Sequence, residues 1–291
     1  MRKINKNLTN PPRNLKPGWA AYDSAILNLS TSKRWPAKSS SIYRSNIVKT
    51  ALDNYYHEKC AYCNQKPKGS RLQVEHFRPK DGVKGTAHTG YYWLGYEWTN
   101  LLFACGNCNG HKGTEFPLLN GVRRLDSPIW IGQNIDLNHN YSYSSTIKIE
   151  KPVLINPELD NPDDHLVYLR DGKLEHLSDK GEESIRVYDL NRDELYVNGR
   201  QKFIDEFLKK ITKRVERYSN GQRSFEVAKQ DVEDVIYENI LQPIAEEDSF
   251  DHWRYKIFTQ YTDYVLYRFT IQSQINVLNH AFKKLNQLIQ P

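Results

Sequence analysis

The sequence lacks any apolar run long enough to span a membrane, and its first residues lack the apolar segment of a secretory signal. We therefore expect a cytoplasmic protein with no membrane partner, in a compartment where disulfides rarely persist. Cysteine is scarce as well, with four in 291 residues, and no internal repeat or low-complexity tract is present. The composition, 38% hydrophobic and 26% charged, is typical of a globular protein that buries a full core.

Acidic residues are scarce in the first part of the chain. Residues 1–120 contain 18 Lys and Arg but only 7 Asp and Glu, a net charge of +11, whereas residues 121–291 contain 23 and 28, a net charge of −5. An excess of positive charge is typical of a surface that binds polyphosphates, so the first part is predicted to bind nucleic acid. An ordinary solvated face is the alternative.

The four cysteines form two Cys-x-x-Cys pairs, Cys60 with Cys63 and Cys105 with Cys108. Each pair supplies two thiolates from one tight turn, and four thiolates complete the tetrahedral shell of a structural zinc ion. Buried reduced thiols are the alternative, but two correctly spaced pairs with no other cysteine favour zinc. The long segment between the pairs leaves room for a functional insertion.

An acid–histidine pair, Glu75 and His76, lies between the two cysteine pairs. Histidine has an ordinary pKa of about 6.5, which suits a general base near neutral pH. Glu75 and Asn109 offer oxygen atoms of the kind that Mg²⁺ prefers. Residues 72–77 alternate like a strand, which would turn Glu75 and His76 to opposite faces, so a strand end or a bulge is needed. A histidine buried in the core is the alternative for His76.

The motifs Glu75-His76, Asn100-Leu-Leu and Cys105-x-x-Cys108-Asn109-x-x-Lys112 resemble those of the HNH endonuclease superfamily. The resemblance implies an α+β fold class with a ββα-metal finger. It implies that His76 activates water, that Glu75 and Asn109 hold a catalytic Mg²⁺ or Mn²⁺, and that Asn100 orients the catalytic loop. Glu75 stands where Asp is commoner and Asn109 where His is common, and both retain an oxygen donor.

A narrower resemblance, to the Septu-type, PtuB-like HNH nucleases that are also found beside retrons, covers most of the chain. It rests on several short strings: Val74–Lys80, Tyr91–Leu101, Phe116–Leu118, Ile155–Pro157, Asp160–Pro162 and Leu190–Arg192. It implies anti-phage defence together with a partner ATPase, PtuA-like, and leaves a retron reverse transcriptase and its DNA as further partners. The chain has no Gly-x-x-x-x-Gly-Lys-Ser/Thr loop, so the ATPase is expected to be a separate subunit.

Composition and periodicity divide the chain into four parts. They are an N-terminal extended arm (1–42), a nuclease domain (43–120), an irregular or β-rich connection (121–180) and a helical region (181–291). Thr146–Val153 and Leu166–Leu169 read as β-segments, and Asp171-Gly172 as a hairpin turn. The aromatic run Tyr91–Trp98 is predicted to pack in the core. The acidic helical region is expected to dock a partner.

Basic residues near the motifs are candidates for contacts with phosphates. These candidates are Arg78, Lys80, Lys84 and Lys112. DNA is the favoured substrate, and a structured RNA such as tRNA is the alternative. A non-catalytic zinc module would explain the cysteines but gives no role to Glu75 and His76. A zinc deaminase is disfavoured, because four cysteines leave no open position on the metal.

Overall fold

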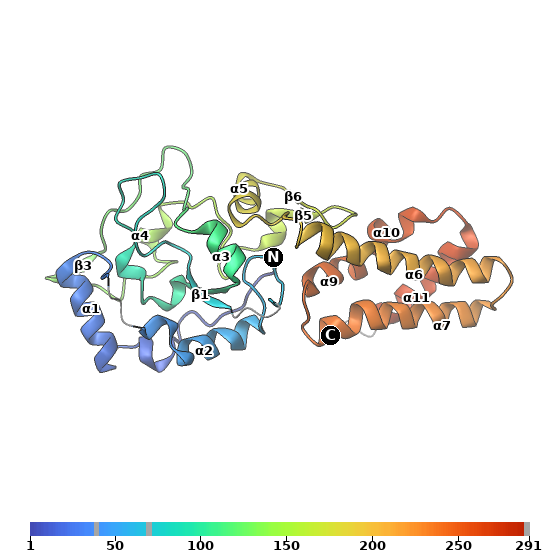
Figure 1. The fold of residues 1–291 in the computed structure, drawn as a ribbon, viewed down its shortest axis with the longest axis horizontal. Helices are drawn as coiled ribbons and strands as arrows, with labels where there is room; N and C mark the ends of the chain where they lie inside the picture. The colour runs from blue at the N-terminus through green and yellow to red at the C-terminus, as the bar shows by residue number, and fades with distance from the viewer. Residues whose placement is uncertain (38–40, 68–71, 288–291) are drawn as a thin grey trace. The chain divides into compact units, whose positions relative to one another are not determined.

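The computed structural model describes residues 1–37, 41–67 and 72–287 and divides the chain into two compact units (Figure 1). The first, here called the N-terminal unit, comprises Met1–Val167 and His176–Leu190. The second, the C-terminal unit, comprises Tyr168–Glu175 and Asn191–Pro291. The arm, the nuclease domain and most of the connection that we expected as separate parts therefore share one unit.

The expected ββα finger is present at the centre of the N-terminal unit. Strands β1 (Gln73–His76) and β2 (Leu101–Ala104) pair antiparallel, and helix α3 (Gly106–Lys112) follows directly. Figure 1 labels β1 and α3 side by side. Cys105 is the N-cap of α3, and its side chain accepts a hydrogen bond from the backbone N–H of Cys108. Both strands and the helix agree with the sequence-based prediction.

The expectation of an extended arm over residues 1–42 is wrong beyond residue 19. Residues Ala20–Ser32 form helix α1, and a 3-10 turn (Ile42–Arg44) leads into helix α2 (Asn46–Tyr56). The prolines and glycine that disfavour helix lie between residues 11 and 18, so they do not interrupt α1. Tyr22 and Leu29 are buried, which anchors the helix to the unit.

The first residues of the chain are also part of the core. Lys6 is fully buried, and its Nζ lies 2.8 Å from Glu158 Oε2. The same ammonium donates hydrogen bonds to the carbonyl oxygens of Trp98, at 2.9 Å, and Leu101, at 2.7 Å. These two carbonyls flank Asn100, so the N-terminal segment fixes the backbone from which Asn100 projects.

Residues 121–180 contain less β-structure than expected. The predicted β-segment at Thr146–Val153 is wrong in its first part, because residues Ser145–Lys148 form helix α4, which Ser144 caps by accepting from the N–H of Ile147. Its last part pairs weakly, because Pro152 forms an isolated antiparallel bridge with Leu118. The hairpin around Asp171-Gly172 is confirmed by β5 (Leu166–Tyr168) and β6 (Leu174–His176). The other elements here are β3 (Trp130–Ile131), β4 (Asn134–Ile135) and α5 (Asp179–Tyr188), which packs against α3.

Short 3-10 helices connect several of these elements. They are Arg13–Leu15, Tyr92–Leu94, Trp98–Asn100 and Pro162–Asp164. Two of them carry the aromatic run between the cysteine pairs, whose side chains from Tyr91 to Trp98 are buried apart from that of Glu97. The run therefore packs in the core, as the sequence predicted.

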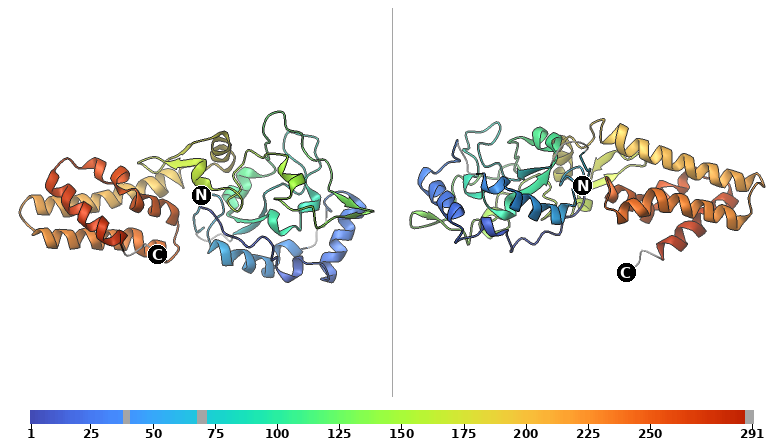
Figure 2. Two further views of the ribbon diagram at one scale, coloured as in Figure 1. Left: turned by 180° about the vertical axis from the view of Figure 1, so that it is seen from behind. Right: turned by 60° about the horizontal axis from the view of Figure 1, so that its bottom comes forward.

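The C-terminal unit is helical, as expected. Its helices are α6 (Lys202–Ser219), α7 (Phe225–Ile236), α8 (Gln242–Ala245), α9 (Asp251–Thr259), α10 (Tyr261–Tyr264) and α11 (Gln272–Asn286), with π-helical turns at Tyr196–Gln201 and Tyr237–Leu241 and a 3-10 turn at Leu266–Arg268. Figure 2 shows α6, α7 and α11 lying side by side. Their apolar stripes form the core of the unit.

In the described parts of the chain, no helix combines the length and apolar character that crossing a membrane requires.

Candidate active site

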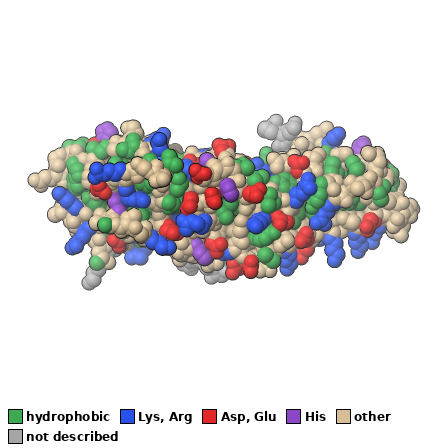
Figure 3. Space-filling model, turned by 90° about the horizontal axis from the view of Figure 1, so that it is seen from above, with side chains coloured by type: hydrophobic (Ala, Val, Ile, Leu, Met, Phe, Trp, Pro, Cys, Tyr) green, Lys and Arg blue, Asp and Glu red, His purple; other side chains and the backbone are tan. Residues whose placement is uncertain are grey.

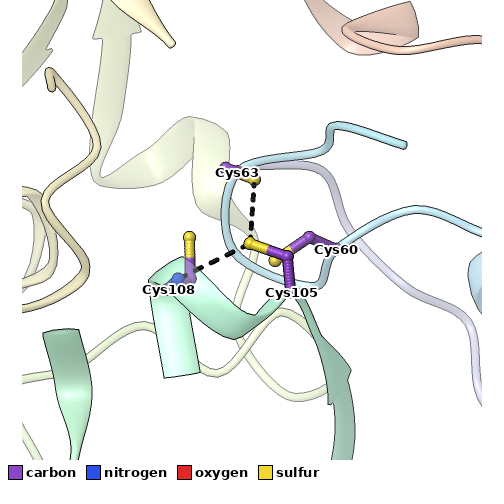
Figure 4. A group of neighbouring side chains, drawn as sticks. All are labelled: Cys60, Cys63, Cys105 and Cys108. Carbon is purple, nitrogen blue, oxygen red and sulfur yellow. Dashed lines mark hydrogen bonds between the residues drawn. The ribbon is translucent and has the colours of Figure 1, made fainter. Parts of the chain in front are cut away.

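The four cysteines meet at one point, as the pair spacing predicted. Cys60 and Cys63 lie in the turn after α2, and Cys105 and Cys108 at the start of α3 (Figure 4). All four are buried, their sulfur atoms lie within 4.8 Å of one another, and Cys63 Sγ is 3.9 Å from Cys105 Sγ. Sulfurs around tetrahedral zinc at ~2.3 Å would be about 3.8 Å apart, so the cluster has the dimensions of a zinc site.

The His76 ring is fixed by one hydrogen bond. Its Nε2 lies 2.9 Å from the carbonyl oxygen of Gly95. A carbonyl oxygen can only accept, so Nε2 carries the proton of the neutral ring and Nδ1 keeps its lone pair. Burial lowers the pKa of His76 well below its usual range; the positive charge of Lys80 and, to a smaller extent, that of Lys112 act in the same direction, and the bond to Gly95 opposes them. The ring therefore offers a neutral nitrogen base.

Aromatic side chains from outside the finger surround His76. Tyr43 meets the imidazole edge to face at 4.8 Å between ring centroids, and Trp35 does so at 6.1 Å. Trp35 also packs on Tyr96 at 5.0 Å and lies close against Gly95, where a Cβ atom would be 1.9 Å from Trp35 Cζ3. Only glycine fits here, and this close approach holds in place the carbonyl that orients His76.

We predict that Gly95→Ala impairs cleavage more than it impairs stability. The new methyl group forces Trp35 and the Gly95 carbonyl apart, and a displacement of about 1 Å in a catalytic group costs about 10²-fold in rate. Overpacking should cost only about 1–3 kcal/mol of stability. Cleavage rates and urea denaturation check this.

Gly110→Ala is the matched control, since apart from the neighbouring backbone of its own helix no heavy atom lies within 4 Å of its Cβ position. Trp35→Leu in the Gly95→Ala background should recover part of the activity by making room. Full activity in Gly95→Ala would contradict the role of this contact.

Glu75 and His76 line the same cleft, of about 700 Å³, although they are consecutive in a strand. His76 is the last residue of β1, so the strand alternation ends there and the predicted need for a strand end is met. Glu75 Oε1 lies 2.7 Å from Lys112 Nζ, and both side chains are almost completely buried. Lys112 also donates to the His76 carbonyl oxygen at 2.9 Å, so one ammonium positions both residues of the pair.

Asn100 is buried in the core, whereas Asn109 lies in the cleft. Asn100 is fully buried, and its side chain accepts from the N–H of Arg78 at 2.8 Å and donates to the carbonyl oxygens of Arg78, at 3.0 Å, and Leu94, at 3.2 Å. It thereby ties the segment after His76 to the segment before Gly95. Asn109 lies in the cleft, where its Nδ2 donates to Gln73 Oε1 at 2.7 Å. That bond engages the nitrogen and leaves the amide oxygen for a cation.

The donor set fits a divalent cation. Glu75 pairs with Lys112 through Oε1, so its other carboxylate oxygen and the Asn109 amide oxygen are two hard ligands that the cleft offers, and Asp81 adds a further carboxylate to its lining. Sequence reasoning placed both residues at a metal, and the structure brings both to one cleft.

The four basic residues predicted to contact phosphates differ in their positions. Arg78 and Lys112 are wrong as direct contacts, because both are buried and paired: Arg78 Nε lies 3.0 Å from Glu150 Oε2. Lys80 lines the cleft, whereas Lys84 is exposed, lies 3.4 Å from Glu115 and is not among the lining residues. A basic residue near a motif is therefore not always a surface residue.

Two basic side chains of the cleft were missed by sequence reasoning. Arg44 and Lys49, which precede the first cysteine pair, line the cleft beside Lys80. Arg44 is exposed and Lys49 half-buried, and the available signal was their basic side chains at the start of the helix predicted over residues 43–59. On the face drawn in Figure 3, side chains of both signs are interspersed over both units, so the cleft is the more specific indicator of a phosphate site.

Comparison with known proteins places the finger in a family. An HNH endonuclease family model matches residues 60–115, the segment with both cysteine pairs, β1, β2 and α3. This segment is an HNH endonuclease domain. The Septu protein PtuB of Bacillus mycoides (strain KBAB4) is 36% identical over 162 residues, 53% of this chain and 50% of that protein. The Septu protein PtuB of Bacillus thuringiensis is 33% identical over 94 residues, 30% of this chain and 33% of that protein.

A third relative carries a different name. The Septu protein PtuA of Bacillus mycoides (strain KBAB4) is 31% identical over 151 residues, 50% of this chain and 19% of that protein. The chain spans half or less of the length of each of these relatives. No solved structure matches it significantly. The HNH, PtuB-like resemblance inferred from the motifs is confirmed, and the HNH domain carries Glu75, His76, Asn100 and Asn109.

Proposed function

We propose that the chain is a metal-dependent endonuclease that hydrolyses phosphodiester bonds of nucleic acid, with DNA as the favoured substrate. The observation that carries the proposal is the meeting of His76, Glu75 and Asn109 in one cleft of an HNH domain. A zinc module without activity has no use for a buried histidine whose Nδ1 keeps its lone pair beside a carboxylate.

In this mechanism His76 is the general base. Its Nδ1 takes a proton from water, and the water oxygen attacks the phosphorus while the Gly95 carbonyl holds the ring in place. The bond from phosphorus to the 3′ oxygen breaks, and this oxygen takes a proton from solvent. As the superfamily resemblance implies, the ends are then a 5′-phosphate and a 3′-hydroxyl.

Glu75 and Asn109 would hold the divalent cation, Mg²⁺ or Mn²⁺, which when bound neutralises charge that develops on the phosphate. Lys112 keeps the Glu75 carboxylate in place through their ion pair. Arg44, Lys49 and Lys80 meet neighbouring phosphates of the substrate strand. The four cysteines would hold zinc, which builds the finger and takes no part in the chemistry.

Plasmid cleavage in Mg²⁺ or Mn²⁺, and its loss with chelator, tests the proposal. Asn109→Ala should raise the metal concentration needed for half-maximal cleavage by at least about tenfold, because one of two protein ligands is lost. Asn107→Ala, an exposed asparagine on the same helix, is the matched control. An intact protein that binds nucleic acid but never cleaves it would favour the non-catalytic module. Cleavage of tRNA but not plasmid would favour the RNA alternative.

The narrower resemblance supports a role in anti-phage defence with a separate ATPase, PtuA-like, as partner. None of the three relatives is named for a retron, and we propose no reverse transcriptase partner. Helix α5 packs against α3 in the N-terminal unit, so the proposed docking region begins after Leu190 rather than at residue 181. Tyr237 and Tyr255, which are 55% and 44% exposed in the C-terminal unit, are candidate contacts.

We predict that Tyr237→Asp with Tyr255→Asp abolishes co-purification with the proposed PtuA-like ATPase. Placing charge on an apolar contact leaves it desolvated without a partner, which weakens binding. Ile131→Asp, at an equally exposed apolar residue of the N-terminal unit, is the control. Undiminished association of the double variant would contradict docking through these side chains.

A further inference from the structure

A second cavity of about 670 Å³ lies within the N-terminal unit, next to the catalytic segment. Phe77 and Arg78, the two residues that follow His76, line it, and none of its described lining residues lines the active-site cleft. The nuclease mechanism gives this cavity no role.

One wall of the second cavity is apolar and partly aromatic. Phe77 and Tyr143 contribute rings, and Pro152, Val153 and Leu159 contribute aliphatic surface. Phe77 is buried, whereas the other four are partly accessible. Such a wall suits a flat aromatic ring, and the volume lies within the range of small-molecule sites.

Three buried side chains that line this cavity each keep an unsatisfied polar atom. No group in the described chain hydrogen-bonds with Arg78 Nη1, Ser142 Oγ or Asn156 Nδ2, although each residue is at most 2% exposed. Their other atoms are engaged: Arg78 Nε pairs with Glu150, and Asn156 Oδ1 accepts from the N–H of Glu158 at 3.0 Å. A buried donor that makes no hydrogen bond costs stability, and all three of these atoms can donate. A ligand rich in acceptor oxygens and nitrogens would complement them.

Positive charge lies at the rim of the second cavity. Lys148 and Lys151 are exposed there, and neither has a carboxylate within 4 Å among the residues that the structure describes. Lys180 is paired with Asp160 at 2.9 Å, which leaves Asp179 as the acidic side chain that opposes the two lysines. Lys151 has a φ of 45°, a conformation that a non-glycine residue adopts at a cost.

We propose that this second cavity binds a mononucleotide. The base lies against Phe77 and Tyr143, the phosphate is held by Lys148 and Lys151, and base or sugar acceptors meet the buried donors. The ligand then contacts the two residues next to the general base, and Asn100 already ties Arg78 to the loop before Gly95. The site is thus placed to couple a free nucleotide to the nuclease.

Titration calorimetry on the full chain, with no divalent metal in the buffer, tests this site directly. The probes are AMP, GMP, CMP and UMP, with adenosine and inorganic phosphate as separate arms. At least one nucleotide should bind one to one, and both adenosine and phosphate should bind at least about tenfold more weakly, because each lacks half of the contacts. Lys148→Ala with Lys151→Ala, at two exposed residues whose backbone the alanines retain, should weaken nucleotide binding at least about tenfold.

Two controls locate the binding. Lys173→Ala, at an exposed lysine outside both cavities, and Lys80→Ala, in the active-site cleft, should leave nucleotide affinity unchanged. The proposal is overturned if no nucleotide binds at millimolar concentration, or if phosphate alone binds as well as a nucleotide. It is equally overturned if Lys80→Ala, and not the double variant, removes binding. Because no cleavage is measured, failure here leaves the nuclease proposal untouched.

Discussion

Replacing His76 by alanine is expected to lower the rate of phosphodiester cleavage by about 10²- to 10⁴-fold, the range that a positioned general base contributes. The ring is buried, its Nε2 is committed to the Gly95 carbonyl, and its Nδ1 is left to take the proton from water. In the described cleft, His76 is the only histidine among the lining residues, so no neighbouring imidazole can replace it. Single-turnover cleavage of a labelled duplex at saturating metal measures the loss.

The fold should survive this change, which separates a lost base from a lost structure. His76 contributes its backbone to β1 and its carbonyl to Lys112, and alanine retains both groups. Circular dichroism and the zinc content should therefore match those of the parent protein. His139→Ala, at an exposed histidine of the N-terminal unit, should cleave at the parent rate. Near-parent cleavage by His76→Ala, in a preparation free of host nucleases, would remove His76 from the mechanism.

The sequence predicted those parts of the site that short motifs specify. The spacing of the cysteines and the pair Glu75-His76 indicated the finger, because a tetrahedral metal and a general base tolerate few residue types. Lys112 and Arg78 were assigned to the substrate because a charge near a motif looks the same in sequence whether it is exposed or buried. The structure pairs Lys112 with Glu75 and Arg78 with Glu150, which converts both into supports of the catalytic segment.

What the sequence could not predict depends on contacts between distant residues. Gly95 lies in the Tyr91–Leu101 string, but nothing in that string indicates a need for close packing, which appears only when Trp35 lies against it. Lys6 resembles any basic residue of a polar N-terminus until it is found beside Glu158 and the carbonyls around Asn100. Helix α1 was missed because nearby prolines outweighed its own helix-forming residues. Much of the HNH site is thus held by chain outside the matched segment 60–115.

Loss of the zinc that we propose for the four cysteines should have the largest effect on stability. Structural zinc contributes on the order of 10–16 kcal/mol of apparent binding energy in small zinc-finger peptides, which exceeds the net stability of most domains. In the N-terminal unit the cysteines join the turn after α2 to the start of α3, so both cleft walls depend on the cluster. Cys108→Ser, or a strong chelator, should therefore unfold this unit and abolish cleavage, and no added Mg²⁺ should restore it.

Tryptophan fluorescence can follow this transition with good selectivity. Five of the six tryptophans, Trp19, Trp35, Trp93, Trp98 and Trp130, belong to the N-terminal unit, and Trp253 to the C-terminal unit. Cys108→Ser should shift most of the emission to the red, and elemental analysis should show the loss of one zinc per chain. Asn107→Ala changes the neighbouring exposed residue without removing a ligand and should behave like the parent. If Cys108→Ser kept parent fluorescence and activity, the cluster would be four buried thiols, and the finger would be held by its apolar core alone.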